Sequence, residues 1–180
     1  MHSIIHQALG TFWSNERAAA AVEFAAPALL LAVGLLNAID VGYYAYKRME
    51  VENAAQVGAQ AAWKTCYDSS TMLPATQNCA GLNAAITTAI QSTSLGTSVS
   101  LADGYPAEGY YCATSSNTLQ SVGSLTSKPA NCSGAGDAST SPGDYIQVGV
   151  TFAYSPLFAI TVMSVSGIKS ITKTSWMRLG

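Results

Sequence analysis

An uncharged apolar run near the N-terminus constrains the fold of this chain more than any other feature. No charged residue occurs from Phe24 to Ile39, and the run reaches Tyr46 if Asp40 lies near its far boundary. The segment 24–46 supplies the roughly 20 residues that an α-helix needs to cross the hydrocarbon core of a membrane. We therefore predict one membrane-spanning helix, ending in tyrosines that suit the membrane interface.

Glu23 stands at the head of this run, RAAAAVEFAAPALLLAVGLLNAIDVGYY. A carboxylate at the edge of a membrane span is costly unless it has a partner, so Glu23 is a candidate functional residue. The alternative is a carboxylate that reaches out to the lipid headgroups.

The run does not fit an ordinary secretory signal peptide. Such a peptide has an apolar core of 7–15 residues followed by a small-x-small cleavage site. Here the run is longer, and Ala45-Tyr46-Lys47 after it is a poor site. An uncleaved membrane anchor therefore remains an alternative to any form of processing.

All four cysteines lie beyond the apolar run, at Cys66, Cys79, Cys112 and Cys132. No two of them form a CxxC pair and no histidine follows residue 6, so their spacing does not fit a zinc site. Two disulfides are the better interpretation, and they place residues 66–180 in an oxidising compartment. Three connectivities are possible, of which the pairs Cys66–Cys79 and Cys112–Cys132 close the shortest loops.

Charge does not settle which way the helix crosses. Arg17 precedes the run, but Lys47 and Arg48 follow it, against the positive-inside rule. The cysteines indicate instead that the C-terminal side is periplasmic and the N-terminus cytoplasmic. The formal net charge of −2, from 8 Lys and Arg against 10 Asp and Glu, offers no reason to expect nucleic acid as a partner.

The helix is predicted to continue well past the membrane. Residues 47–64 contain no proline and are rich in helix formers, so a helix over 18–64 would be about 70 Å long. Ala54, Gly58 and Ala62 form a stripe of small residues at i, i+4 and i+8. The stripe is either a face for packing against other subunits or a chance product of an alanine-rich helix.

Asn37 and Asp40 are a second polar feature of the apolar run. They stand at i and i+3, on nearby helix faces. They either form hydrogen bonds with a neighbouring helix or, in the case of Asp40, mark the depth of the membrane interface.

The C-terminal part is predicted to be a small antiparallel sheet with one helix packed on it. Apolar residues at helical spacing predict a short helix around 81–92. Ile146, Val148, Val150 and Phe152 alternate with more polar residues, as in a half-buried strand. The predicted strands are 97–102, 108–114, 145–154 and 168–178, with a loop over 127–145. The fold class is therefore α+β: a long hydrophobic helix followed by a disulfide-stapled sheet domain.

The sequence carries no pattern typical of an enzyme. Both histidines, His2 and His6, precede the apolar run, which removes Ser-His-Asp and Cys-His arrangements from the C-terminal domain. The segments 166–169 and 170–173 match S-x-x-K, but SDN and KTG do not accompany them. We predict no catalytic residue, no metal and no cofactor.

The N-terminal motif resembles that of the TadE-like minor pseudopilins of the tight-adherence (Tad) type IV pilus. Members carry an arginine, a glycine, three small residues and then Val-Glu-Phe-Ala. Here Arg17 is followed by Ala18 in the place of the glycine, by the alanines 19–21, and by VEFA at 22–25. The stretches EGYYCATSS, GDYIQVGVTFAYSPLF and ITKTSWMRLG are similar to the C-terminal part of the family, more loosely.

This resemblance implies how Glu23 is used. A membrane prepilin peptidase would cut between Ala18 and Ala19, which makes Glu23 the fifth residue of the mature chain. The new α-ammonium of one subunit and Glu23 of a neighbour would then form a salt bridge that offsets the cost of burying both charges. The alanine in place of glycine is the one departure from the motif, and it falls at the cleavage site.

The resemblance also implies a domain organisation and a set of partners. Residues 1–18 would be a cytoplasmic leader, 19–64 the transmembrane helix with its periplasmic extension, and 65–180 the extracytoplasmic head. The expected partners are other pilin and pseudopilin subunits, the prepilin peptidase, the inner-membrane assembly platform and the lipid bilayer. The second hypothesis is an uncleaved, membrane-anchored periplasmic scaffold or binding module. The third, a membrane-tethered enzyme, has almost no support in the sequence.

Overall fold

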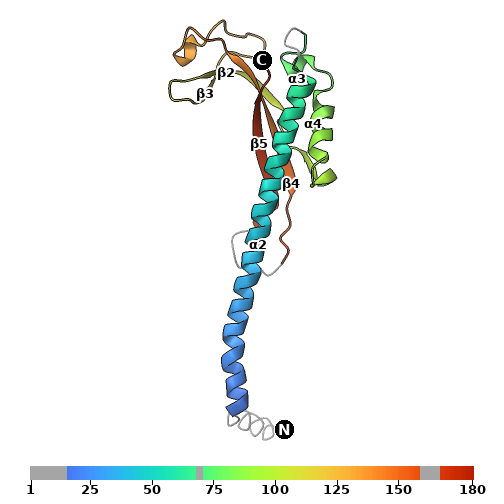
Figure 1. The fold of residues 1–180 in the computed structure, drawn as a ribbon, viewed down its shortest axis with the longest axis vertical. Coiled ribbons are helices and arrows are strands. Elements are labelled where there is room, and N and C mark those ends of the chain that lie inside the picture. The colour runs from blue at the N-terminus through green and yellow to red at the C-terminus, as the bar shows by residue number, and fades with distance from the viewer. Residues whose placement is uncertain (1–15, 68–70, 159–166) are drawn as a thin grey trace, which may run out of the picture. The chain divides into compact units, whose positions relative to one another are not determined.

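The long helix dominates the N-terminal part of the chain (Figure 1). The computed structural model describes residues 16–67, 71–158 and 167–180, with side chains from residue 20 onward. Helix α2 runs without interruption over Glu16–Thr65, 50 residues that include Pro27 near the start. The predicted continuation of the helix past the apolar run is therefore confirmed. Residues 1–15, most of the predicted leader, lie outside the described part.

The chain divides into two compact units. The first comprises Met1–Tyr44 with Pro156–Gly167, and the second comprises Ala45–Ser155 with Ile168–Gly180. The apolar run of α2 falls in the first unit. The second half of α2, the sheet and both disulfides fall in the second.

The second unit is built on a five-stranded antiparallel sheet whose longest member is β4. Its strands are β1 (Val99–Leu101), β2 (Ala107–Ala113), β3 (Leu119–Ser121), β4 (Gly143–Ala153) and β5 (Ser170–Arg178). β4 pairs with β5 from Tyr145↔Arg178 to Ala153↔Ser170. It also pairs with β2 near its start and with β1 near its end, while β3 extends the sheet from β2. The alternation predicted for β4 holds at Ile146, Val148 and Val150, which are fully buried, whereas Phe152 is only half-buried.

The core of the second unit forms where α2, α4 (Leu82–Gln91) and β4 meet. A Cβ atom at Gly58 would lie 2.8 Å from Ile90 Cγ2 and 3.1 Å from Val148 Cγ1, so only glycine fits there without a shift. The α2 residues that are fully buried in this unit are Val51, Ala54, Ala55, Ala59 and Ala62. The stripe of small residues therefore packs inside its own chain, which leaves it unavailable as a face between subunits.

Both predicted disulfides are present. Cys66–Cys79 joins the residue after α2 to the residue after α3 (Ala75–Asn78). Cys112–Cys132 joins β2 to the segment that leads into β4. Each bond fixes a separate part of the second unit, one at the end of α2 and one between β2 and the loop before β4.

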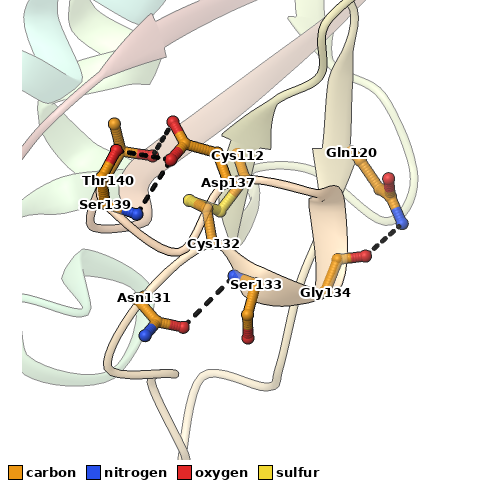
Figure 2. The surroundings of a disulfide bond; sticks show 9 residues. All are labelled: Cys112, Gln120, Asn131, Cys132, Ser133, Gly134, Asp137, Ser139 and Thr140. Carbon is orange, nitrogen blue, oxygen red and sulfur yellow. Dashed lines mark hydrogen bonds between the residues drawn. A yellow bond between two sulfur atoms is a disulfide. The ribbon is translucent and has the colours of Figure 1, made fainter.

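The loop around Cys132 is organised by a carboxylate (Figure 2). Asp137 accepts hydrogen bonds from the Ser139 amide at 2.8 Å, the Ser139 hydroxyl at 2.6 Å and the Thr140 hydroxyl at 3.1 Å. These bonds, led by that of the Ser139 hydroxyl, lower the pKa of Asp137. The long polar loop is thus ordered next to Cys112–Cys132 by local side-chain contacts, as is typical of Asx turns.

The short elements β3 and α3 were not predicted from the sequence. The strand β3 has three residues and all are exposed, so its sequence shows no apolar alternation from which a strand could be predicted. The helix α3 has four residues and no side-chain cap of its own. It depends instead on a carboxylate more than thirty residues away, which no local pattern reveals.

Candidate functional site

The apolar half of α2 is the candidate functional segment. By length and composition, α2 is the one described helix that is apolar enough to cross a membrane. Its large apolar side chains are mostly exposed; they include Val22, Phe24, Leu29, Leu30, Leu31 and Leu35. Leu31 and Phe24 each expose 75% of their surface. An apolar surface this extensive requires lipid or protein around it.

Glu23 is placed on the surface of this segment, one residue before Phe24. Its side chain is exposed, and neither ion pair found among the described residues includes it. Ala18 and Ala19 lie in the first turn of α2, and their side chains are outside the described part. The structure thus places the exposed side chain of Glu23 at the head of the apolar surface.

Asp40 has a partner that the sequence analysis did not foresee. It is fully buried, and its Oδ1 atom accepts hydrogen bonds from the backbone amides of Leu157 at 2.9 Å and Phe158 at 3.3 Å. These amides follow the end of β4, where the ladder no longer supplies acceptors. A carboxylate that accepts two adjacent amides is strongly held, because hydrogen bonds to a charged acceptor are roughly twice as strong as neutral ones.

The side-chain amide nitrogen of Asn37 also has its hydrogen-bond acceptor within the chain. Its Nδ2 atom donates to the carbonyl of Val33 at 2.7 Å, and only 7% of the residue is exposed. Asn37 Oδ1 and Asp40 Oδ2 are buried and have no hydrogen-bond partner among the described residues, so the hydrogen bonds expected from these side chains to a neighbouring helix stay a prediction.

Glu50 forms a polar cluster further along α2. It accepts hydrogen bonds from the Tyr46 hydroxyl at 3.0 Å, the Lys47 ammonium at 2.6 Å and the Ser94 hydroxyl at 2.5 Å. Burial by itself raises the pKa of Glu50, but the hydrogen bonds and the charge of Lys47 outweigh it and lower the pKa. The i, i+3 spacing of Lys47 and Glu50 in the sequence was a signal that the sequence analysis overlooked.

The second unit also has an open polar cleft. Its volume is about 490 Å³, and its lining includes Gln77, Asn78, Asn83 and Tyr105. None of the buried unpaired polar atoms found in the described part of the chain belongs to this lining. Nor do any three His, Cys, Asp or Glu side chains of the described residues lie close enough to hold a metal ion together. The cleft is a surface hollow without a built site.

Comparisons with protein-family models, curated proteins and solved structures give no match to this chain.

Proposed function

We propose that this protein is a minor pilin or pseudopilin of a Tad-type adhesion pilus. Its apolar helix would lie in the bacterial inner membrane before assembly and pack beside other pilin helices afterwards. The N-terminus would be cytoplasmic and the disulfide-bonded domain periplasmic. The observation that carries the proposal is the exposed apolar surface of α2 with Glu23 at its head, exposed and in no ion pair among the described side chains.

The proposed mechanism is assembly through charge pairing. Cleavage between Ala18 and Ala19 creates an α-ammonium one turn before Glu23. Within a bundle of pilin helices, the carboxylate of one subunit neutralises the ammonium of its neighbour, and the apolar side chains bury one another. The protein catalyses no reaction in this scheme. The prepilin peptidase and the assembly platform of the inner membrane act on it.

Glu23 suits this role better than the other acidic residue in the apolar segment. Asp40 is buried and already accepts two amides, so a partner would have to displace them. Glu23 is exposed and needs no rearrangement. Its position at the head of the apolar surface also lets a neighbouring chain reach it from the polar side of the membrane.

The second candidate is a permanently anchored periplasmic scaffold or binding module of the same apparatus. The exposed leucines of the helix would suit a permanent anchor in lipid as well as packing in the core of a pilus. The same uncleaved chain would then keep its leader, and Glu23 would lie among the headgroups.

Intact mass and N-terminal sequencing of the protein from native membranes separate the two candidates. A chain that begins at Ala19 supports prepilin-type processing. A chain that retains its leader rejects that processing and favours the anchor.

The pairing is tested by pilus assembly in Glu23→Gln. Glu16→Gln is the matched control, since it removes a carboxylate from the same helix on the other side of the cleavage site. We expect Glu23→Gln to reduce pilus number strongly while the protein is still cleaved, and Glu16→Gln to assemble normally. Normal assembly of Glu23→Gln would reject the salt bridge.

A further inference from the structure

Asp144, near the start of β4, is a buried carboxyl group without a donor. Only 1% of the residue is exposed, and neither Oδ atom has a hydrogen-bond partner among the described residues. An ionised carboxylate is unfavourable in such a place, because burial removes its hydration and no hydrogen bond compensates for the loss. Something must therefore neutralise Asp144.

Glu108 on β2 is the acidic neighbour of Asp144. Tyr110 stands opposite Asp144 in the register of β2 and β4, and Glu108 is two residues before Tyr110, so it is a diagonal neighbour on the same face. Two carboxylates can bond to each other only if one of them carries a proton. A proton shared between the two carboxyl groups would therefore supply the partner that Asp144 lacks.

The proton belongs on Asp144, since Glu108 is already held as an acceptor. Glu108 accepts hydrogen bonds from the backbone amides of Ala75 at 2.6 Å and Thr76 at 2.7 Å, and from the Thr76 hydroxyl at 2.5 Å. These three donors use both oxygens of Glu108 as acceptors. No donor reaches Asp144, so the shared proton lies on Asp144. The resulting O–H group donates a hydrogen bond to Glu108.

The other groups around Asp144 do not supply a positive charge strong enough to keep Asp144 ionised. Burial, then the charge of Glu108 and a hydrogen bond with it, raise the pKa of Asp144 to about 7, although Lys128 acts in the opposite direction. Lys128 lies over the Tyr110 ring, 5.2 Å from its centroid. The pKa of Tyr110 is itself raised by burial and then by the two carboxylates, so Tyr110 is a neutral neighbour.

The backbone of Asp144 holds the last residues of the chain. Its amide donates to the Gly180 oxygen at 2.8 Å, and its carbonyl accepts from the Leu179 amide at 2.8 Å. Arg178, the charged group on the β5 side, donates from Nε to the same Gly180 oxygen at 3.1 Å. We call the contacts of Glu108 with residues 75–76 and of Asp144 with residues 179–180 the carboxyl latch.

We propose that Asp144 carries a proton shared with Glu108, and that this proton keeps the carboxyl latch closed, so that the latch opens more readily as the pH rises. In the open state Asp144 returns to water and recovers an ordinary pKa near 4. The closed state therefore binds a proton that the open state lacks between about pH 4 and pH 7. The opening equilibrium rises by up to about tenfold per pH unit in this window and levels off above it. In an extracytoplasmic domain, this makes the start of α3 and the chain end responsive to the acidity of the surroundings.

The experiment is amide hydrogen exchange on the full chain in detergent micelles at pH 5 and pH 8, corrected for the intrinsic pH dependence of exchange. In the wild type we expect the protection of amides 75, 76 and 179 to fall by about ten- to a hundredfold from pH 5 to pH 8. Asp144→Asn has no proton to lose, so its protection should be the same at both values. Asp137→Asn, which changes an exposed aspartate of the same domain, should behave as the wild type. Equal pH profiles for the wild type and Asp144→Asn would overturn the proposal.

Two further measurements keep the proposal testable. If Asp144→Asn does not fold, Glu108→Gln serves instead, because removing the neighbouring charge should also reduce the pH dependence of exchange. An unchanged pH dependence in Glu108→Gln would overturn the proposal.

Calcium added to the wild type at pH 8 tests for a metal ion in place of the proton. Protection restored by calcium in the wild type, and not in Asp144→Asn, would show that a cation neutralises the pair and would overturn the proton assignment. The outcome does not depend on whether the protein is a pilin.

Discussion

Asp40 and Leu157, 117 residues apart in the chain, are joined by a hydrogen bond of 2.9 Å from the Leu157 amide to the Asp40 carboxylate. A carboxylate in an apolar helix is usually interpreted as a contact to another helix or to the membrane interface. Here it holds the segment that follows β4 within the same compact unit. The buried, intramolecular Asp40 thus differs from Glu23, whose side chain is exposed.

Replacing Asp40 should release this segment. In Asp40→Leu the amides of residues 157 and 158 lose their acceptor, and a hydrogen bond to a charged group contributes about 1.5–3 kcal/mol. Hydrogen exchange of these two amides, measured on the full chain in lipid nanodiscs, should become much faster. Asp40→Asn keeps an acceptor oxygen and should show a smaller effect. Equal exchange in the wild type and Asp40→Leu would contradict the contact.

Gly58 should not tolerate a larger side chain. Its Cβ position is 2.8 Å from Ile90 Cγ2, so Gly58→Val should overpack the core and destabilise the second unit by about 1–3 kcal/mol. Gly42→Val is the matched control, because a Cβ atom at Gly42 meets nothing within 4 Å. Thermal unfolding in detergent, followed by circular dichroism, should show a lower Tm for the first variant and a nearly unchanged one for the second. A Tm loss shared by both variants would point to helix propensity instead.

Glu50 should stabilise the protein in a pH-dependent way. Its pKa is lowered in the folded state, so its contribution is present above the unfolded value of 4.5 and is lost as the pH falls through the folded pKa. Glu50→Gln should therefore cost about 1.5–3 kcal/mol at pH 7, the usual range for a hydrogen bond to a charged group, and less at pH 3.

Glu52→Gln is the control for this experiment. Glu52 is more exposed and pairs with Lys173 at 3.6 Å, so its loss should cost no more than about 1 kcal/mol. Chemical unfolding at pH 7 and pH 3 measures the free energy of unfolding of the two variants and the wild type. Equal losses for Glu50→Gln at pH 7 and pH 3 would contradict the charged state assigned to Glu50.

Each disulfide should contribute separately to stability. Cys66–Cys79 and Cys112–Cys132 close loops with sequence separations of 13 and 20 residues, so the loss of either should cost about 3 kcal/mol. The paired variants Cys66→Ala/Cys79→Ala and Cys112→Ala/Cys132→Ala should each leave the other bond intact on peptide mapping under non-reducing conditions. A peptide that links Cys66 to Cys112 or Cys132 in the wild type would refute the pairing.

The amino-acid sequence by itself determined the elements whose pattern is local. Charge-free apolar residues over 24–39 predicted the helix, and the alternation at 146–152 predicted β4. The cysteine spacing favoured the pairing that the structure confirms. In each case neighbouring residues carry the whole signal, because helix and strand periods extend over a few residues and short loops are the easiest to close.

Only the tertiary structure decided how the polar and small residues are used. The partners of Asp40 lie more than a hundred residues away, Glu108 supports a four-residue helix, and the stripe around Gly58 packs against its own chain. A side chain's type limits what it can bind, yet its partner depends on which distant segment the fold brings beside it. The proton on Asp144 follows from the same cause, since two carboxyl groups ordinary in sequence become coupled only where β2 and β4 pair.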